Sequence, residues 1–146
     1  MSRAQDLEGL LEATFPRLVV NGNVAPHACA ECDALNARLA GITWRDVPLE
    51  FIEENDGALP LLSDEAYLAL LPAWLLAAIR NPDGPAAGMV PIALEGARSR
   101  SALTDEQAAV IVDVVDFVAC ASAYGRDDSV NQRHLEDIRR IYGREE

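Results

Sequence analysis

The sequence has few aromatic residues, few basic residues and only three cysteines, and each shortage excludes a class of protein. Phe, Trp and Tyr make up 5% of the 146 residues. Since β-branched residues are also sparse beside alanine and leucine, the composition favours helices over a sheet. Three is an odd number of cysteines, which argues against a disulfide framework and for a reducing compartment. Twelve Lys and Arg face twenty-four Asp and Glu, and the formal net charge of -12 opposes binding to nucleic acid or to an anionic membrane surface.

Long apolar runs and known catalytic motifs are also missing. The longest apolar run, residues 67–79, is too short to cross a bilayer and contains Pro72. The first residues lack the basic-then-apolar order of a signal peptide, so we expect a cytoplasmic protein. The glycine-rich phosphate-binding loop, the dinucleotide fingerprint and the hydrolase nucleophile motif do not occur. We therefore expect no catalytic residues.

The residues that are present predict an all-α fold. Half of the chain is hydrophobic, and 146 residues are enough to bury a core without a disulfide or a metal. Apolar side chains recur at helical spacing in several segments. We expect a single helical domain over residues 1–146, a compact bundle of five to six helices joined by loops. The predicted helices cover residues 4–15, from Pro26 to a closing Gly41, 48–55, 66–79, 104–121 and 129–142.

Several residues mark where these helices begin, bend or end. Ser63 is placed to cap the fourth helix, and Thr104 with Gln107 has the spacing of a capping box. Pro72 is expected to kink the fourth helix or to split it. The Pro/Gly-rich segment at about residues 81–103 is predicted to be one long loop, which either binds a ligand or is partly ordered against the core.

One short segment concentrates the reactive side chains: His27, Cys29 and Cys32. Imidazole and thiolate are ligands that zinc prefers, but a closed tetrahedral site needs a fourth ligand, from Cys120 or His134. The C-x-x-C spacing is also typical of thiols that form a reversible disulfide. A third interpretation is structural, with Cys32 a small core residue and Cys29 half buried beside it. The sequence leaves these three interpretations open.

A second candidate surface is acidic. Glu50, Glu53, Glu54 and Asp56 lie on or beside the short third helix, whose apolar residues Leu49 and Ile52 are expected to be buried. The spacing of a calcium-binding loop is not present. These carboxylates are expected to be solvated, and we predict that they form a recognition surface for a basic protein.

The H-x-C-x-E-C segment, Trp44 and the stretch from Leu59 through Tyr67 to Pro72 together resemble a bacterial family of small proteins, domain of unknown function 6714. The resemblance covers roughly residues 25 to 120 of this chain. It implies no reaction. In size and charge the chain is also similar to bacterial immunity proteins and antitoxins, which cover the active site of a partner.

From these observations we expect an acidic cytoplasmic protein-binding module, an inhibitor of the immunity or antitoxin type with a basic protein partner. The alternative is a zinc-binding or thiol-redox protein built on His27, Cys29 and Cys32. A second alternative is a structural subunit that associates with itself. The sequence does not identify the partner or the oligomeric state, and it does not decide between metal binding, redox chemistry and packing for the cysteine pair.

Overall fold

The computed structural model describes every residue except 1, 21, 96–99, 122–128 and 144–146. Over these residues the chain is all-α, as predicted, and contains no strand. No helix among them has the length and apolar character that crossing a membrane requires. The described part forms α1 (Arg3–Thr14), α2 (Ala30–Leu39), η1 (Trp44–Asp46), α3 (Leu49–Glu54), η2 (Asp56–Leu61), α4 (Asp64–Arg80), α5 (Pro85–Glu95), η3 (Arg100–Ala102), α6 (Asp105–Ala121) and α7 (Ser129–Tyr142), where η marks a 3-10 helix.

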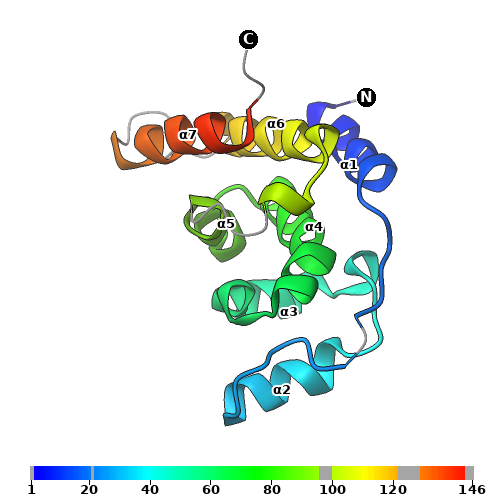
Figure 1. Ribbon diagram of the computed structural model, residues 1–146. Helices are drawn as coiled ribbons and strands as arrows, with labels where there is room; N and C mark the ends of the chain where they lie inside the picture. Colours follow the sequence, from blue (N-terminus) through cyan, green and yellow to red (C-terminus); the bar gives the residue numbers. More distant parts are fainter. Residues whose placement is uncertain (1, 21, 96–99, 122–128, 144–146) are drawn as a thin grey trace.

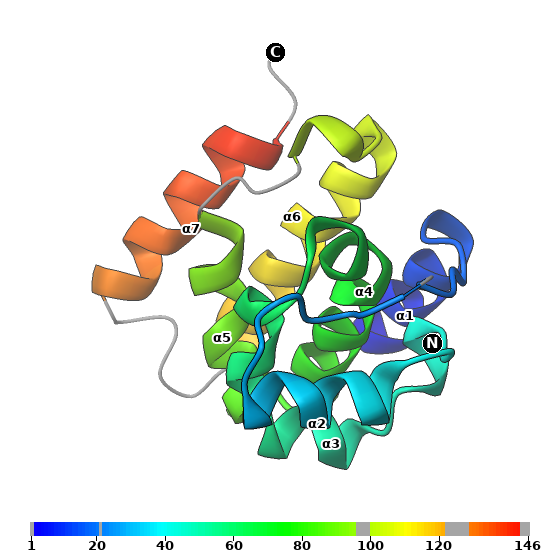
Figure 2. The same ribbon diagram turned by 60° about the horizontal axis from the view of Figure 1, so that its bottom comes forward.

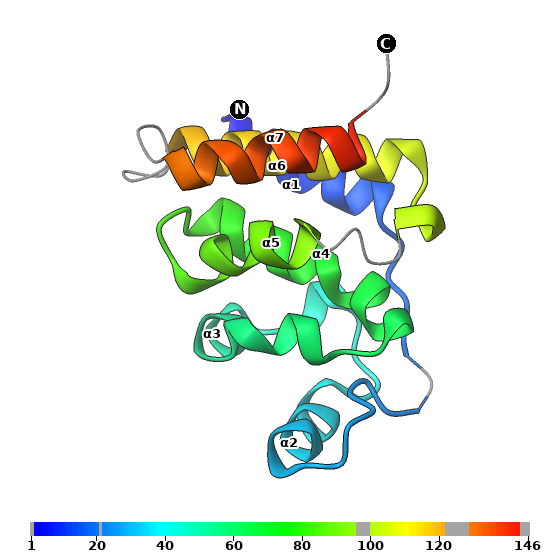
Figure 3. The same cartoon turned by 60° about the vertical axis from the view of Figure 1, so that its left-hand side comes forward.

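The helices stack in layers between two ends of the molecule. α1, α6 and α7 form the layer at one end, α4 and α5 lie beneath it, and α3 follows (Figures 1 and 3). α2 lies at the opposite end. The segment that joins α1 to α2 runs along the side of the molecule from the first layer to this end (Figures 1 and 2). The buried hydrophobic side chains form one cluster to which all seven α-helices contribute.

α4 is the central helix, because nearly all of its side chains are buried. Ser63 caps it as predicted, with its hydroxyl accepting the N–H of Ala66 at 3.1 Å. α4 continues through Pro72, so the alternative in which this proline splits the helix is wrong. Proline inside a helix removes one backbone hydrogen bond and its ring clashes with the preceding turn, at a cost of about 3 kcal/mol. Each large apolar side chain buried on α4 contributes roughly 1.5–3 kcal/mol, and α4 buries several of them. Burial therefore holds the helix together across Pro72.

The prediction of one long loop at 81–103 is wrong. α5 occupies Pro85–Glu95 and η3 occupies Arg100–Ala102, while residues 96–99 lie outside the described residues. Ala86, Val90 and Leu94 are buried at intervals of four residues and give α5 one apolar face. Pro85 stands in the first turn, where a missing N–H costs nothing. The glycines and prolines of the segment therefore suggested a loop where packing against α4 stabilises a helix.

The predicted extents of the last two helices agree with the structure. Thr104 and Gln107 form the capping box, with both backbone-to-side-chain hydrogen bonds at 3.0 Å. On α7, the residues Leu135, Ile138 and Tyr142 are buried. The Tyr142 hydroxyl donates to the carbonyl of Leu94 at 2.9 Å and thereby joins α7 to α5.

Candidate metal centre

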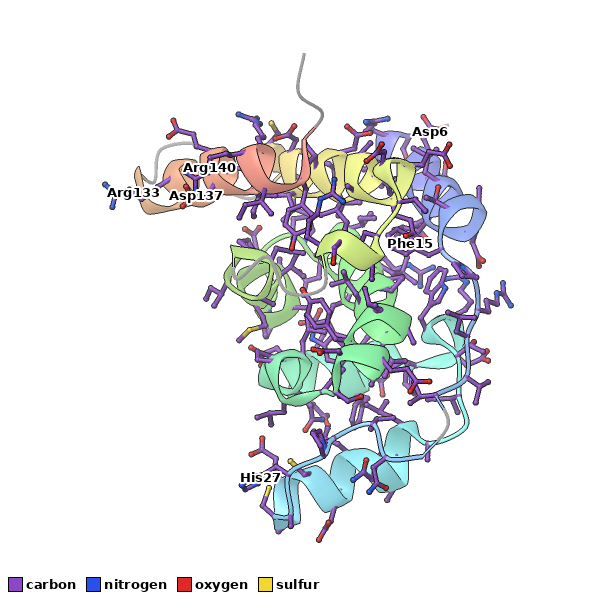
Figure 4. All side chains as sticks on the ribbon, in the orientation of Figure 1. Asp6, Phe15, His27, Arg133, Asp137 and Arg140 are labelled. Atoms are coloured by element: carbon purple, nitrogen blue, oxygen red, sulfur yellow. The ribbon has the colours of Figure 1, made fainter. Side chains whose placement is uncertain are left out.

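His27, Cys29 and Cys32 come together in the structure. One ligand atom from each, a ring nitrogen and two Sγ atoms, lies within 4.8 Å of the other two. His27 stands at the α2 end of the molecule, away from the layer of α6 and α7 (Figure 4). The histidine is exposed, Cys29 is half-buried and Cys32 is only 1% exposed. The site therefore opens to solvent at the histidine and is closed at Cys32.

The local geometry depends on where α2 begins. The prediction that Pro26 opens this helix is wrong: α2 starts at Ala30 and Cys29 is its N-cap residue. Cys29 is extended, with φ -156° and ψ 165°, and its Sγ accepts the backbone N–H of Cys32 at 3.3 Å. A free N–H at a helix start needs an acceptor, and here the sulfur supplies it. This bond holds both sulfur-bearing residues at the first turn of α2.

The segment before His27 is anchored by residues that the sequence analysis did not select. The side chain of Asn36 forms two hydrogen bonds with Ala25, accepting its N–H at 2.9 Å and donating to its C=O at 3.0 Å. The C=O of Val24 accepts the N–H of Ser63 at 2.8 Å. Because Val24 and Ala25 are also buried, the chain enters the site in a fixed position. The sequence held one indication of this contact, because asparagine is disfavoured inside a helix and Asn36 is found there with its amide bonded to backbone groups outside the helix.

The surroundings lower the pKa of one thiol and raise the pKa of the other. The pKa of Cys29 is lowered from 9.0 to about 7, first by the hydrogen bond from the Cys32 backbone and then by hydrogen bonds from the side chains of His27 and Cys32. The pKa of Cys32 is raised, first because its side chain is hydrogen-bonded to the side chain of Cys29, which favours the protonated thiol of Cys32, and then because burial disfavours a thiolate. Near neutral pH, Cys29 therefore provides a thiolate while Cys32 keeps its proton.

The predicted sources of a fourth ligand do not complete the site. Cys120 is exposed on α6, in the layer at the other end of the molecule from α2 (Figures 1 and 3). The side chain of His134 lies outside the described residues. Over the described part of the chain, the group contains three potential ligands. A metal bound here would keep one coordination position for water or for an external ligand.

The acidic surface is smaller than predicted. Glu50 and Glu54 are exposed, but Glu53 and Asp56 are half-buried. The Oε2 atom of Glu53 is buried, and an added Cβ at Gly84 would stand only 2.8 Å from it. Glu53 is thus turned toward the connection between α4 and α5. The prediction that its side chain is fully solvated is therefore wrong.

A search of protein-family models, of curated proteins and of solved structures finds no match to this chain. The resemblance to domain of unknown function 6714 stays a prediction.

Proposed function

We propose that this chain binds a zinc ion through His27, Cys29 and Cys32. The observation that carries the proposal is the convergence of one imidazole nitrogen and two sulfurs within 4.8 Å. In a tetrahedral zinc site with Zn–S of about 2.3 Å and Zn–N of about 2.0 Å, neighbouring ligand atoms are roughly 3.5–3.8 Å apart. Rotations that move each ligand atom by about 1 Å would therefore complete the coordination geometry.

The charge and softness of the ligands favour the same metal. Two thiolates and a neutral imidazole suit zinc better than the oxygen-preferring ions magnesium and calcium. Zinc must displace the proton of each thiol, and the lowered pKa of Cys29 makes one of these steps easy near neutral pH. The anchored chain before His27 contributes further, because the ligands need little additional ordering when the ion binds.

Metal analysis of protein purified without a histidine tag tests the proposal. We expect one equivalent of zinc, and a cobalt-substituted protein with thiolate-to-metal charge-transfer bands and a tetrahedral visible spectrum. His27→Gln, Cys29→Ser and Cys32→Ser should each lower the affinity by at least about 100-fold, more than the loss of an outer-shell partner. Cys120→Ser is the matched control and should bind normally. Zinc well below one equivalent, or equal affinity in the four variants, would refute the site.

We propose as a second function that the chain binds a basic protein, as an inhibitor of the immunity or antitoxin type. The net charge of -12 and the exposed Glu50 and Glu54 on α3 favour it, since a cationic partner would be steered toward this surface. After a partner has been isolated from the native host, its affinity should fall when salt is raised. It should also fall when both glutamates are changed to lysine. An affinity that responds to neither change would remove the electrostatic basis of this function.

The third expectation, a subunit that associates with itself, stays a prediction. Leu18 and Val19 between α1 and α2 are 52% and 49% exposed, and Ile92 on α5 is 56% exposed, so the described part of the chain offers exposed apolar side chains that self-association would cover. Light scattering over a range of protein concentrations tests it, because a molar mass that stays at that of one chain would exclude self-association.

A further inference from the structure

We infer that Cys29 and Cys32 also carry out thiol–disulfide exchange, with Cys29 as the attacking sulfur and Cys32 as the resolving sulfur. Three features of the first turn of α2 support this assignment of roles: the short distance between the two sulfurs, their unequal exposure and the extended backbone of Cys29. The oxidant is an external disulfide of low molecular weight. Only the competition with zinc described below rests on the proposed function.

The unequal exposure of the two sulfurs sets the order of attack. Cys29 is half-buried and stands beside the exposed His27, so an external disulfide can reach it. Cys32 is 1% exposed, which leaves no room for an in-line approach from outside. Cys29 Sγ also stands at the N-terminus of α2, where the backbone N–H of Cys32 contacts it at 3.3 Å. The helix dipole at this end stabilises a negative sulfur as it attacks or leaves.

The backbone allows the second step. Closing the disulfide shortens the distance between the two Sγ atoms from within 4.8 Å to about 2.05 Å. Cys29 is the residue that can supply this movement, because it is the extended N-cap residue and no preceding helical turn restricts its χ1 rotation. Cys32, inside the helix, can remain where it is. Ring closure therefore needs no displacement of α2.

The reaction balances as two exchanges. The thiolate of Cys29 attacks one sulfur of the external disulfide, which forms a mixed disulfide and releases the first external thiolate. Cys32 gives up its proton to solvent, with His27 placed to relay it, and attacks Cys29 Sγ, so the second external thiolate leaves. Both released thiolates take up protons. Two cysteine thiols are oxidised and one external disulfide is reduced to two thiols.

Disulfide formation and zinc binding exclude each other, because both use the same two sulfurs. Oxidation would release the ion, and a bound ion would protect the thiols from oxidation. The pair therefore forms a redox-controlled metal site.

The experiment uses full-length protein carrying Cys120→Ser, which removes the exposed third thiol. Metal-free protein is incubated with glutathione disulfide, quenched with acid, and analysed by mass spectrometry. We expect the loss of two hydrogen atoms and no lasting adduct. Adding Cys32→Ser should trap glutathione on Cys29, whereas Cys29→Ser should form an adduct at least about tenfold more slowly, since Cys32 is buried. Cys32→Ala repeats the trapping without a buried hydroxyl, and circular dichroism verifies that each variant is helical.

His27→Gln separates this inference from the proposed function. It removes a zinc ligand but leaves both sulfurs, so it should still form the disulfide, more slowly because His27 no longer contacts Cys29, and should lose the protection that zinc gives. Adduct formation at equal rates in the two single-cysteine variants, or a pair that stays reduced, overturns the exchange inference even if zinc binds. A disulfide that forms equally fast with and without zinc overturns the competition and leaves the exchange standing.

Discussion

The surroundings of Cys29 should make its thiol more reactive at neutral pH than an ordinary cysteine thiol. Its pKa is about 7 in the folded chain against 9.0 without the fold, so at pH 7 about half of it is thiolate instead of about one part in a hundred. A thiolate of lower pKa is also a weaker nucleophile. With a Brønsted coefficient of about 0.45, two pKa units reduce the intrinsic rate roughly eightfold. The gain in thiolate is roughly fiftyfold, so Cys29 should be alkylated at pH 7 about six times faster than an ordinary thiol.

Alkylation of metal-free Cys120→Ser protein with iodoacetamide measures this directly. The rate against pH should have its midpoint near 7, and in urea the midpoint should move to about 9. His27→Gln should raise the midpoint, because the hydrogen bond from His27 is the second cause of the lowered pKa. The thiolate contributes stability fully above pH 9, and this contribution is lost as the pH falls through about 7. A midpoint near 9 in the folded protein would refute the hydrogen-bonding account of the site.

Three further outcomes follow from the structure. Thr104→Ala breaks the capping box of α6 and should lower the free energy of unfolding in urea by about 1 kcal/mol. The exposed Ser101→Ala is its control and should leave the stability unchanged within about 0.5 kcal/mol. Asn36→Ala removes both bonds to Ala25 and should weaken zinc binding about tenfold without changing the number of thiolates in the cobalt spectrum; an unchanged affinity would mean that the anchor is irrelevant. Removing zinc from protein equilibrated with free zinc at about 100 times the dissociation constant should cost about 2.7 kcal/mol of stability. Circular dichroism should show the helices retained, because the core is built almost entirely from apolar side chains that need no metal.

The sequence predicted most helices because burial at helical spacing determines them directly. The extents of α6 and α7 and the caps at Ser63 and Thr104 depend mainly on neighbouring residues, and these predictions agree with the structure. α5 was missed because Gly88 and Pro91 disfavour a helix locally, while the contacts that stabilise one come from α4 and α7. Local preference and tertiary packing disagree in that segment, and packing decides.

The candidate site was predictable in composition but not in arrangement. The spacing of His27, Cys29 and Cys32 identified the group because all three lie within one short segment. The start of α2 was misplaced at Pro26, because a cysteine is an uncommon N-cap residue and so gave no signal for the true start. The anchor from Asn36 joins residues eleven positions apart, and only the folded path of the chain brings them into contact. Exposure, which makes the two thiols unequal, is likewise a property of the fold.

The double hydrogen bond between Asn36 and Ala25 has a thermodynamic consequence for any ligand of this site. The entropy of ordering the chain before His27 is lost once, when the protein folds, and is not lost again when an ion arrives. A peptide with the same six residues from His27 to Cys32 would have to bear that cost at each binding event. The affinity of the two sulfurs for an ion therefore depends on the folded domain, and it should be lost when the domain unfolds.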